Sequence, residues 1–475
     1  MIKKVFILLL ISLLLCDIGY TFLQNYHTSF DGDMAGGIVP ADDVKPILDS
    51  PLGIKIFTEH TTYPNPNRFF CHWSFYKYFN NVPLFLQHFT NPIDSAYLSC
   101  AIAKTAIQVV LIFLLSLFVS GGVFKFDFLL AAILVTPLFQ INGYRSYMGI
   151  ISESTTYTFF YALPLILVLI YFAPLFFKHF YGLELKKIKF VWIPLSLVSC
   201  LSGALNPGIS LVVSFLIFIY YFSQNLNNSS TQNRFIKLKT AIQNIPNDYY
   251  FYLIPICAFS LYSLFLGRFN SVSLSNEMPL SVLYSRLPEG IYYLFTQKLG
   301  FPILFLILTI NTLIIRYKFR TEEGRQILNT FKWIGLFALI YILLLPLGGY
   351  RDYRPNVLRY DTIMPITLSL MFIFAKTTLF VVRNFSNRQK YLYMPLVISV
   401  LLVFTISDEP KFDNNTCERN AILQIANSKE SIVEINANCT VLSWTNIENP
   451  QESELNTKLL KIWNIIDEDK LYYQK

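Results

Sequence analysis

The sequence predicts an all-α protein that crosses a membrane many times. Of its 475 residues, 54% are hydrophobic and only 14% are charged, whereas soluble domains carry about a quarter charged residues. Apolar segments approaching the roughly 20 residues that a membrane-spanning helix needs recur along almost the whole chain. This composition excludes a cytosolic enzyme, a disordered chain and a nucleic-acid-binding protein. In a membrane protein, the net charge of +8 is first evidence about topology, because Lys and Arg are retained in cytoplasmic loops.

We expect about eleven spans. The first could instead be a signal peptide, because Lys3 and Lys4 precede a Leu-rich core. Its apolar run extends to Phe22 without a small-residue cleavage site, which favours a retained helix. The expected spans are 5–23, 101–120, 126–142, 157–177, 190–205, 209–221, 249–266, 301–315, 333–347, 362–380 and 391–406.

Basic residues in the connections between these spans set the expected orientation. Short cytoplasmic loops retain Lys and Arg, and one alternating set of connections holds more than twice as many of them as the other. The pattern predicts a cytoplasmic N-terminus and a C-terminal tail outside. We expect a membrane domain at 1–406, with a large first outer loop at 24–99, and an extracytoplasmic domain at 407–475.

The two outer segments differ in pattern. The first outer loop is rich in Pro, Asn and aromatic residues, which indicates short helices lying at the membrane surface. In the tail, 421–433 and 455–466 have helical spacing of apolar residues, and 440–444 could be a short strand. A small α/β or helical cap is expected. Two disulfides are possible, Cys417 with Cys439 and Cys71 with Cys100, but the sequence cannot fix the connectivity.

The first candidate site is an acidic pair directly after the first span. Asp31 and Asp33 lie in the run Phe-Asp-Gly-Asp-Met-Ala-Gly-Gly. Paired carboxylates can bind a divalent cation such as Mg²⁺ or Mn²⁺, or act as a general base, and glycine lets the backbone approach a ligand closely. The same residues are also typical of an ordinary acidic turn.

The second outer connection offers Glu153 with Arg145 as its other charge. Glu153 could supply a second carboxylate to the site, next to the metal or next to the acceptor. It could equally be a glutamate at a helix N-terminus, favoured by the helix dipole.

A later outer connection is rich in arginine and tyrosine, although outer loops are usually poor in positive charge. Arg presents a planar fork that suits phosphate oxygens, so the segment is a candidate phosphate-binding site. It could instead anchor two helix ends to anionic headgroups. The residues of interest are Arg351, Tyr353, Arg354, Arg359 and Tyr360.

Four of the five histidines fall in the first outer loop. They lack the spacing of metal ligands. We therefore expect His60, His72 and Arg145 to line a site without binding a metal.

This layout resembles the GT-C superfamily of polytopic membrane glycosyltransferases, which includes protein mannosyltransferases and aminoarabinose transferases. The resemblance rests on the acidic pair after the first helix, the acid of the second outer loop, the late loop rich in Arg and Tyr, and the outside C-terminal domain. It covers the membrane domain in outline. No Trp-Trp-Asp signature of oligosaccharyltransferases is present.

The resemblance implies transfer of a sugar from a polyprenyl-phosphate or polyprenyl-diphosphate donor to a lipid, glycan or protein acceptor on the outer face. Asp31, Asp33 and Glu153 would then be catalytic, with Asp31 and Asp33 possible metal ligands. Arg351, Arg354 and Arg359, with Tyr353 and Tyr360, would hold the donor phosphate. The implied location is a bacterial inner membrane, with the active site facing the periplasm.

Two other classes of function fit the same composition. A transporter, flippase or polymerase of lipid-linked glycans would also bring arginines to the outer surface, and the interruption at 202–208 could then be a broken helix at its binding site. A non-catalytic scaffold would keep the acidic pair and the arginine loop far apart. A transferase needs them to converge on one cavity.

Overall fold

Long helices dominate the computed structural model, which describes residues 2–139, 148–183, 191–228, 233–272, 279–297, 299–348 and 356–475. Within these ranges, nine helices are long and apolar enough to cross a membrane, so the chain is a mostly helical polytopic membrane protein, close to the expected all-α class. Eight of them are α1 (Ile2–Tyr26), α6 (Pro92–Ser120), α11 (Asn206–Asn228), α13 (Asn247–Gly267), α16 (Gly300–Lys318), α17 (Glu322–Leu344), α18 (Met364–Asn384) and α19 (Asn387–Ile406). The ninth runs through α8 (Thr155–Tyr157), the π-helical turn η3 (Thr158–Ala162) and α9 (Leu163–Tyr181).

Two of the eleven expected spans form shorter helices. The 126–142 span contains α7 (Phe126–Val135) followed by the 3₁₀ turn η1 (Thr136–Leu138), which includes a proline. The 190–205 span contains α10 (Trp192–Cys200), and a turn at 201–205 separates it from α11. Each of the other nine expected spans corresponds to one long helix.

Helix α6 shows how local sequence fixes a span. The Asn91 side chain accepts a hydrogen bond from the Asp94 N–H, which caps the N-terminus ahead of a proline at the first helical position. The helix ends at Gly121, whose φ of +69° is a left-handed conformation that glycine adopts without strain. Near this end, the Tyr181 hydroxyl donates to the carbonyls of Phe118 and Val119, at 2.7 and 2.8 Å.

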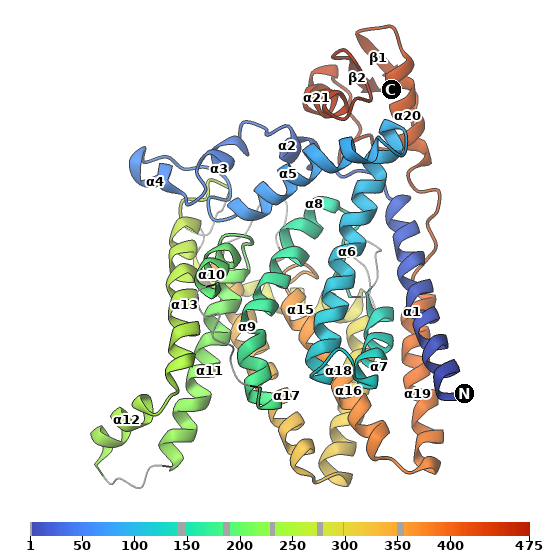
Figure 1. Ribbon diagram of the computed structural model, residues 1–475. Helices are drawn as coiled ribbons and strands as arrows, with labels where there is room; N and C mark the ends of the chain where they lie inside the picture. The colour runs from blue at the N-terminus through green and yellow to red at the C-terminus, as the bar shows by residue number, and fades with distance from the viewer. Residues whose placement is uncertain are drawn as a thin grey trace.

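One end of the helix bundle, here called the capped end, is covered by short helices and by the C-terminal residues (Figure 1). The segment between α1 and α6, here called the first loop, forms α2 (Met34–Ile38), α3 (Lys45–Asp49), α4 (Ile54–Thr58) and α5 (Phe69–Leu86). These helices lie across the ends of the long helices in the figure. Short helices were expected in this segment.

The remaining short helices connect the long ones. Helix α12 (Arg234–Gln243) lies at the end of the bundle opposite the capped end (Figure 1). Helices α14 (Leu280–Ser285) and α15 (Leu287–Thr296) precede α16, and the 3₁₀ turn η4 (Leu345–Gly348) extends α17.

The C-terminal residues form a small α/β unit on the capped end (Figure 1). It contains α20 (Thr416–Asn427), β1 (Ile432–Ile435), the 3₁₀ turn η5 (Pro450–Ser453), α21 (Glu454–Ile462) and β2 (Leu471–Gln474). The two strands pair in parallel, with Ile432 opposite Leu471 and Ile435 opposite Gln474. A disulfide joins Cys417 to Cys439, whereas Cys71 and Cys100 are free and buried.

The strand expected at 440–444 was wrong, because those residues are irregular and the strands lie at β1 and β2. The helix expected at 421–433 ends at Asn427. Val433 and Ile435 are buried on alternate positions of β1, a period-2 pattern too short to separate from the end of a helix in sequence. Loop residue Trp444 instead packs over Gly32 of the first loop, where an added Cβ would lie 2.6 Å from the Trp444 backbone nitrogen.

The first loop and the C-terminal unit share one hydrophobic core. The ring of Phe30 stacks on Tyr97 of α6 with centroids 4.0 Å apart and also contacts Trp463. The indole N–H of Trp463 donates to the carbonyl of Phe79 in α5, at 3.0 Å. Burying a side chain of this size contributes about 1.5–3 kcal/mol, so the C-terminal unit fixes the position of the first loop.

Candidate functional site

A cavity of about 900 Å³ opens at the capped end. Most of its wall comes from three parts of the chain that are far apart in sequence: the first loop, the start of the helix at 155–181, and the C-terminal unit; Val272, after α13, adds to it. Here it is called the capped-end cavity. Lining residues that carry the argument are Asp33, Arg68, His72, Tyr157, Tyr161, Trp444 and Glu452.

The two predicted carboxylates have different environments. Asp33 is exposed and lines the cavity, whereas Asp31 is buried. Both oxygens of Asp31 accept hydrogen bonds from Thr156, from its hydroxyl at 2.7 Å and its backbone N–H at 3.0 Å. Burial raises the pKa of Asp31, and the bonds from Thr156 oppose that effect.

Asp31 joins the first loop to the N-terminus of the helix at 155–181. Ser154 caps this terminus by accepting a hydrogen bond from the Tyr157 N–H at 3.1 Å, and an acid here is favoured by the helix dipole. Asp31 also accepts the N–H of Asp33 at 3.2 Å. The geometry therefore makes Asp31 a residue that positions Asp33 at the cavity.

A metal at this pair stays a prediction. A cation held by Asp31 and Asp33 would compete with Thr156 for the oxygens of Asp31. Within the described ranges, no group of three or more His, Cys, Asp and Glu side chains is arranged to hold a metal ion.

Glu153 lies outside the lining of the capped-end cavity. Its carboxylate pairs with Lys411, at 3.0 Å, in the connection to the C-terminal unit. Its backbone carbonyl accepts a hydrogen bond from Lys104 Nζ at 2.9 Å. Lys104 is fully buried in α6, so a cation inside a membrane-spanning helix fixes the predicted second acidic loop.

The described part of the arginine-rich segment is tied to itself and to the bundle and lies outside the lining of the capped-end cavity, so convergence with the acidic pair on one cavity is not seen among the described residues. Arg359 forms two hydrogen bonds to the buried carboxylate of Asp361, at 3.0 and 2.9 Å. Tyr360 is buried against Phe301 and Gly149. The other predicted residues, Arg145, Arg351, Tyr353 and Arg354, lie outside the described residues.

The two predicted histidines differ in burial. His60 is exposed on the loop after α4. His72 lies on α5, is only 5% exposed, and lines the capped-end cavity. Among the described residues, neither of its ring nitrogens has a hydrogen-bond partner. Burial lowers the pKa of His72 to about 3, and the nearby charge of Arg68 adds to this shift, so the ring is neutral.

Sequence reasoning missed Arg68, Trp444, Glu452 and Lys104. The first three became neighbours only through docking of the C-terminal unit, for which the sequence has no local signal. Lys104 did have a signal, because it is a charge inside an otherwise apolar span, and such residues have a structural or functional partner by default.

A buried acid holds the C-terminal unit against the first loop. The carboxylate of Glu418 accepts hydrogen bonds from the N–H of Phe30, the hydroxyl of Tyr97 and the N–H of Leu442, at 2.7–2.9 Å. Burial raises the pKa of Glu418 to about 7, and these three bonds oppose the shift. One carboxyl group therefore connects three segments of the chain next to the cavity.

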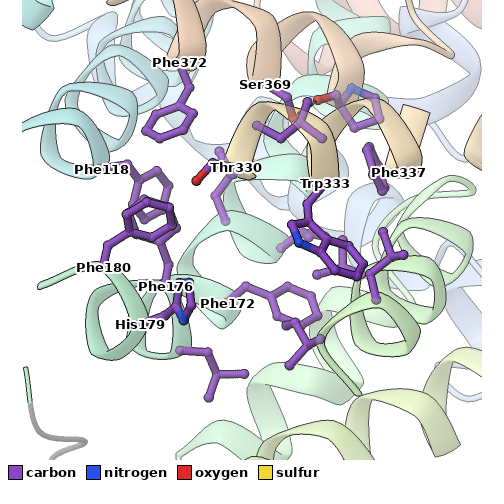
Figure 2. A pocket seen from close by; sticks show the side chains of 18 of the residues that line it. Phe118, Phe172, Phe176, His179, Phe180, Thr330, Trp333, Phe337, Ser369 and Phe372 are labelled. Atoms are coloured by element: carbon purple, nitrogen blue, oxygen red, sulfur yellow. Dashed lines mark hydrogen bonds between the residues drawn. The ribbon is translucent and has the colours of Figure 1, made fainter. Parts of the chain in front are cut away.

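A second cavity, here called the bundle cavity, lies among the long helices α6, α9, α11, α13, α17 and α18 and measures about 350 Å³. Figure 2 shows aromatic side chains around it, including Phe118, Phe176, Trp333 and Phe372. Its lining includes the titratable side chain of His179 and the hydroxyls of Thr330 and Ser369. At membrane depth, such a cavity suits a hydrocarbon chain.

Comparisons of the chain with protein-family models, with curated proteins and with solved structures return no match.

Proposed function

We propose that the protein is a membrane-embedded glycosyltransferase of the GT-C kind. It transfers a sugar from a polyprenyl-phosphate or polyprenyl-diphosphate donor to a lipid, glycan or protein acceptor. The observation that carries this proposal is the capped-end cavity, where the carboxylate of Asp33 lies among aromatic rings and polar side chains next to the ends of the membrane helices. Aromatic rings with carboxylate and amide groups suit the faces and hydroxyls of a sugar.

Orientation follows from two supporting observations. The alternating basic connections favour a cytoplasmic N-terminus. The disulfide between Cys417 and Cys439 suits an oxidising compartment. On this proposal the capped end is the outer face, α7 and α10 complete eleven membrane segments, and the protein belongs to a bacterial inner membrane with its site toward the periplasm.

The proposed reaction is an inverting displacement at the anomeric carbon. Asp33 accepts the proton of the acceptor hydroxyl as that oxygen forms its bond to the anomeric carbon. The bond from this carbon to the phosphate oxygen breaks, and the polyprenyl phosphate leaves with the electron pair. Asp31, held by Thr156, positions Asp33.

Charge on the leaving phosphate is neutralised by the arginines of the segment 351–359. Arg359 would exchange the two carboxylate oxygens of Asp361 for two oxygens of the phosphate, which offer the same bidentate geometry. The C-terminal unit, with Trp444 at the cavity wall, limits the access of water, which would otherwise compete as the acceptor.

The test is release of lipid phosphate from a panel of polyprenyl-phosphate and polyprenyl-diphosphate sugars by the purified protein in nanodiscs, with and without EDTA. The proposal expects release by the wild type and its loss in Asp33→Asn. Sensitivity to EDTA would show that the reaction requires a divalent cation. No release from any donor, with lipid binding retained, would contradict the proposal.

A lipid-linked glycan transporter, flippase or polymerase is the second candidate, favoured by the bundle cavity. An apolar space among six long helices suits the chain of a lipid in transit. A transporter or flippase would move a lipid-linked sugar between the leaflets of a vesicle without cleaving it.

A further inference from the structure

His72 combines three properties that a residue serving the fold alone would not need. It is nine-tenths buried, its ring lies at the wall of the capped-end cavity, and neither ring nitrogen has a hydrogen-bond partner among the described residues. Buried polar groups in native proteins are almost always hydrogen-bonded, and each exception calls for an explanation such as a ligand.

The neighbours of His72 fix its position. The ring of Phe160, from the helix at 155–181, lies 4.5 Å away between centroids. Arg68 stands one helical turn earlier and also lines the cavity. His72 therefore sits where α5 meets the helix that Asp31 anchors.

The protonation state of His72 decides what it can bind. Its lowered pKa keeps the imidazole neutral. A neutral imidazole has one N–H donor and one nitrogen acceptor, which matches a hydroxyl or an amide and gives no charge to a phosphate.

The charges of the wall agree with this preference. The described lining holds three carboxylates, Asp33, Asp43 and Glu452, against the single guanidinium of Arg68. Such a cavity has no surplus positive charge with which to hold a phosphate. The phosphate of a lipid-linked substrate would therefore lie outside it.

We infer that the capped-end cavity binds the uncharged, polyhydroxylated part of the substrate, and that His72 hydrogen-bonds to one hydroxyl or amide of it. The inference rests on the proposed function for the substrate being a sugar. The position of the contact rests on the burial of His72 and on its two ring nitrogens, which have no partner among the described residues. His72 is a binding residue here and takes no part in proton transfer.

The first measurement compares thermal stability without ligand. Replacing a buried polar group that has no partner by an apolar one of similar shape is neutral or stabilising, so His72→Phe should keep or raise Tm. His88→Phe, the same change at an exposed histidine just beyond α5, is the control. A fall in Tm for His72→Phe well beyond the control would show a structural role and overturn the inference.

The second measurement is binding of methyl glycosides, which carry hydroxyls but no phosphate, followed by fluorescence quenching of Trp444 at the cavity wall, with Trp444→Phe as the blank. His72→Phe should weaken binding about tenfold. His72→Gln, which keeps a donor and an acceptor, should retain most of it. Equal binding by the wild type and His72→Phe, or no glycoside bound by the wild type, would overturn the inference.

Turnover separates this inference from the proposed function. With a lipid-linked donor, His72→Phe should raise KM about tenfold and change kcat much less. Glycoside binding that depends on His72, with no turnover in any variant, would keep the inference and remove the transferase. Turnover that is indifferent to His72→Phe would keep the transferase and remove the inference.

Discussion

The capped-end cavity and the bundle cavity differ in how they are built and in what they can hold. The first is assembled from the first loop, one helix start and the C-terminal unit, and its wall carries carboxylates, a guanidinium and an imidazole. The second is a gap among six long helices with a mainly aromatic and aliphatic lining. Charged side chains thus gather in the wall of the capped-end cavity, whereas the bundle cavity offers a mainly apolar surface.

The difference also concerns how firmly each wall is fixed. Asp31 ties the first loop to the start of the helix at 155–181, and Glu418 ties the first loop to the C-terminal unit, which a disulfide braces internally. The bundle cavity depends on side-chain packing between helices. A reaction that requires groups in fixed positions is better served by the first arrangement.

The largest effect is expected at Asp33. Asp33→Asn removes the proposed proton acceptor and should lower turnover about 10²–10⁴-fold, while Tm and membrane abundance stay unchanged because the side chain is exposed. Asp42→Asn, at an exposed acid of the same loop that does not line the cavity, is the matched control. Turnover by Asp33→Asn equal to that of Asp42→Asn would remove the capped-end cavity as the site of reaction.

The next largest effect concerns the pH dependence of the wall. The pKa of Glu418 rises from 4.5 to about 7 on folding. Its contribution to stability is therefore fully present below pH 4.5 and is lost as the pH rises through about 7, by up to about 3 kcal/mol.

Glu418→Gln, which cannot titrate, should flatten the dependence of Tm on pH between these values. Thermal melts of both proteins across that range make the measurement. Parallel Tm profiles for the wild type and Glu418→Gln would show that Glu418 does not control the docking of the C-terminal unit.

A steric change should loosen the same wall. Gly32→Ala places a Cβ 2.6 Å from the Trp444 backbone nitrogen, and overpacking of this kind costs about 1–3 kcal/mol. We expect a lower Tm and weaker binding of a sugar. Gly36→Ala is the control, because its nearest neighbour is 3.7 Å away; the two variants should differ in melts and in binding.

The smallest effect is expected in the bundle cavity. Val213→Leu adds one methylene to the lining of this cavity. The substitution should change the free energy of unfolding by less than about 1.5 kcal/mol and leave turnover within about twofold of the wild type. A loss of turnover as large as that of Asp33→Asn would place the reaction-limiting step in the bundle and favour a transporter. The assay is the donor-release measurement on matched amounts of protein.

Much of the membrane fold could be predicted from sequence, because a run of apolar residues at helical length has few alternatives in a bilayer. Nine of the expected spans are long helices in the structure. The two shorter ones, α7 and α10, could not be told from full spans because hydropathy does not measure how far a helix continues. In the tail, Val433 belonged to a four-residue strand whose pattern also fitted a helix end.

The site was predicted less completely. Asp31 and Asp33 follow the first span, and their place near the membrane surface was visible in sequence. Their division of roles was not, because it depends on Thr156, 125 residues from Asp31 along the chain. His72 and His60 looked equivalent until the fold buried one and exposed the other.

The most direct test is a structure of the protein in nanodiscs with a non-hydrolysable polyprenyl-phosphate sugar bound. The account predicts density for the sugar in the capped-end cavity, within hydrogen-bond distance of Asp33 and His72, with the phosphate outside that cavity. Sugar density anywhere else, or a capped-end cavity left without sugar while the lipid is bound in the bundle, would contradict it.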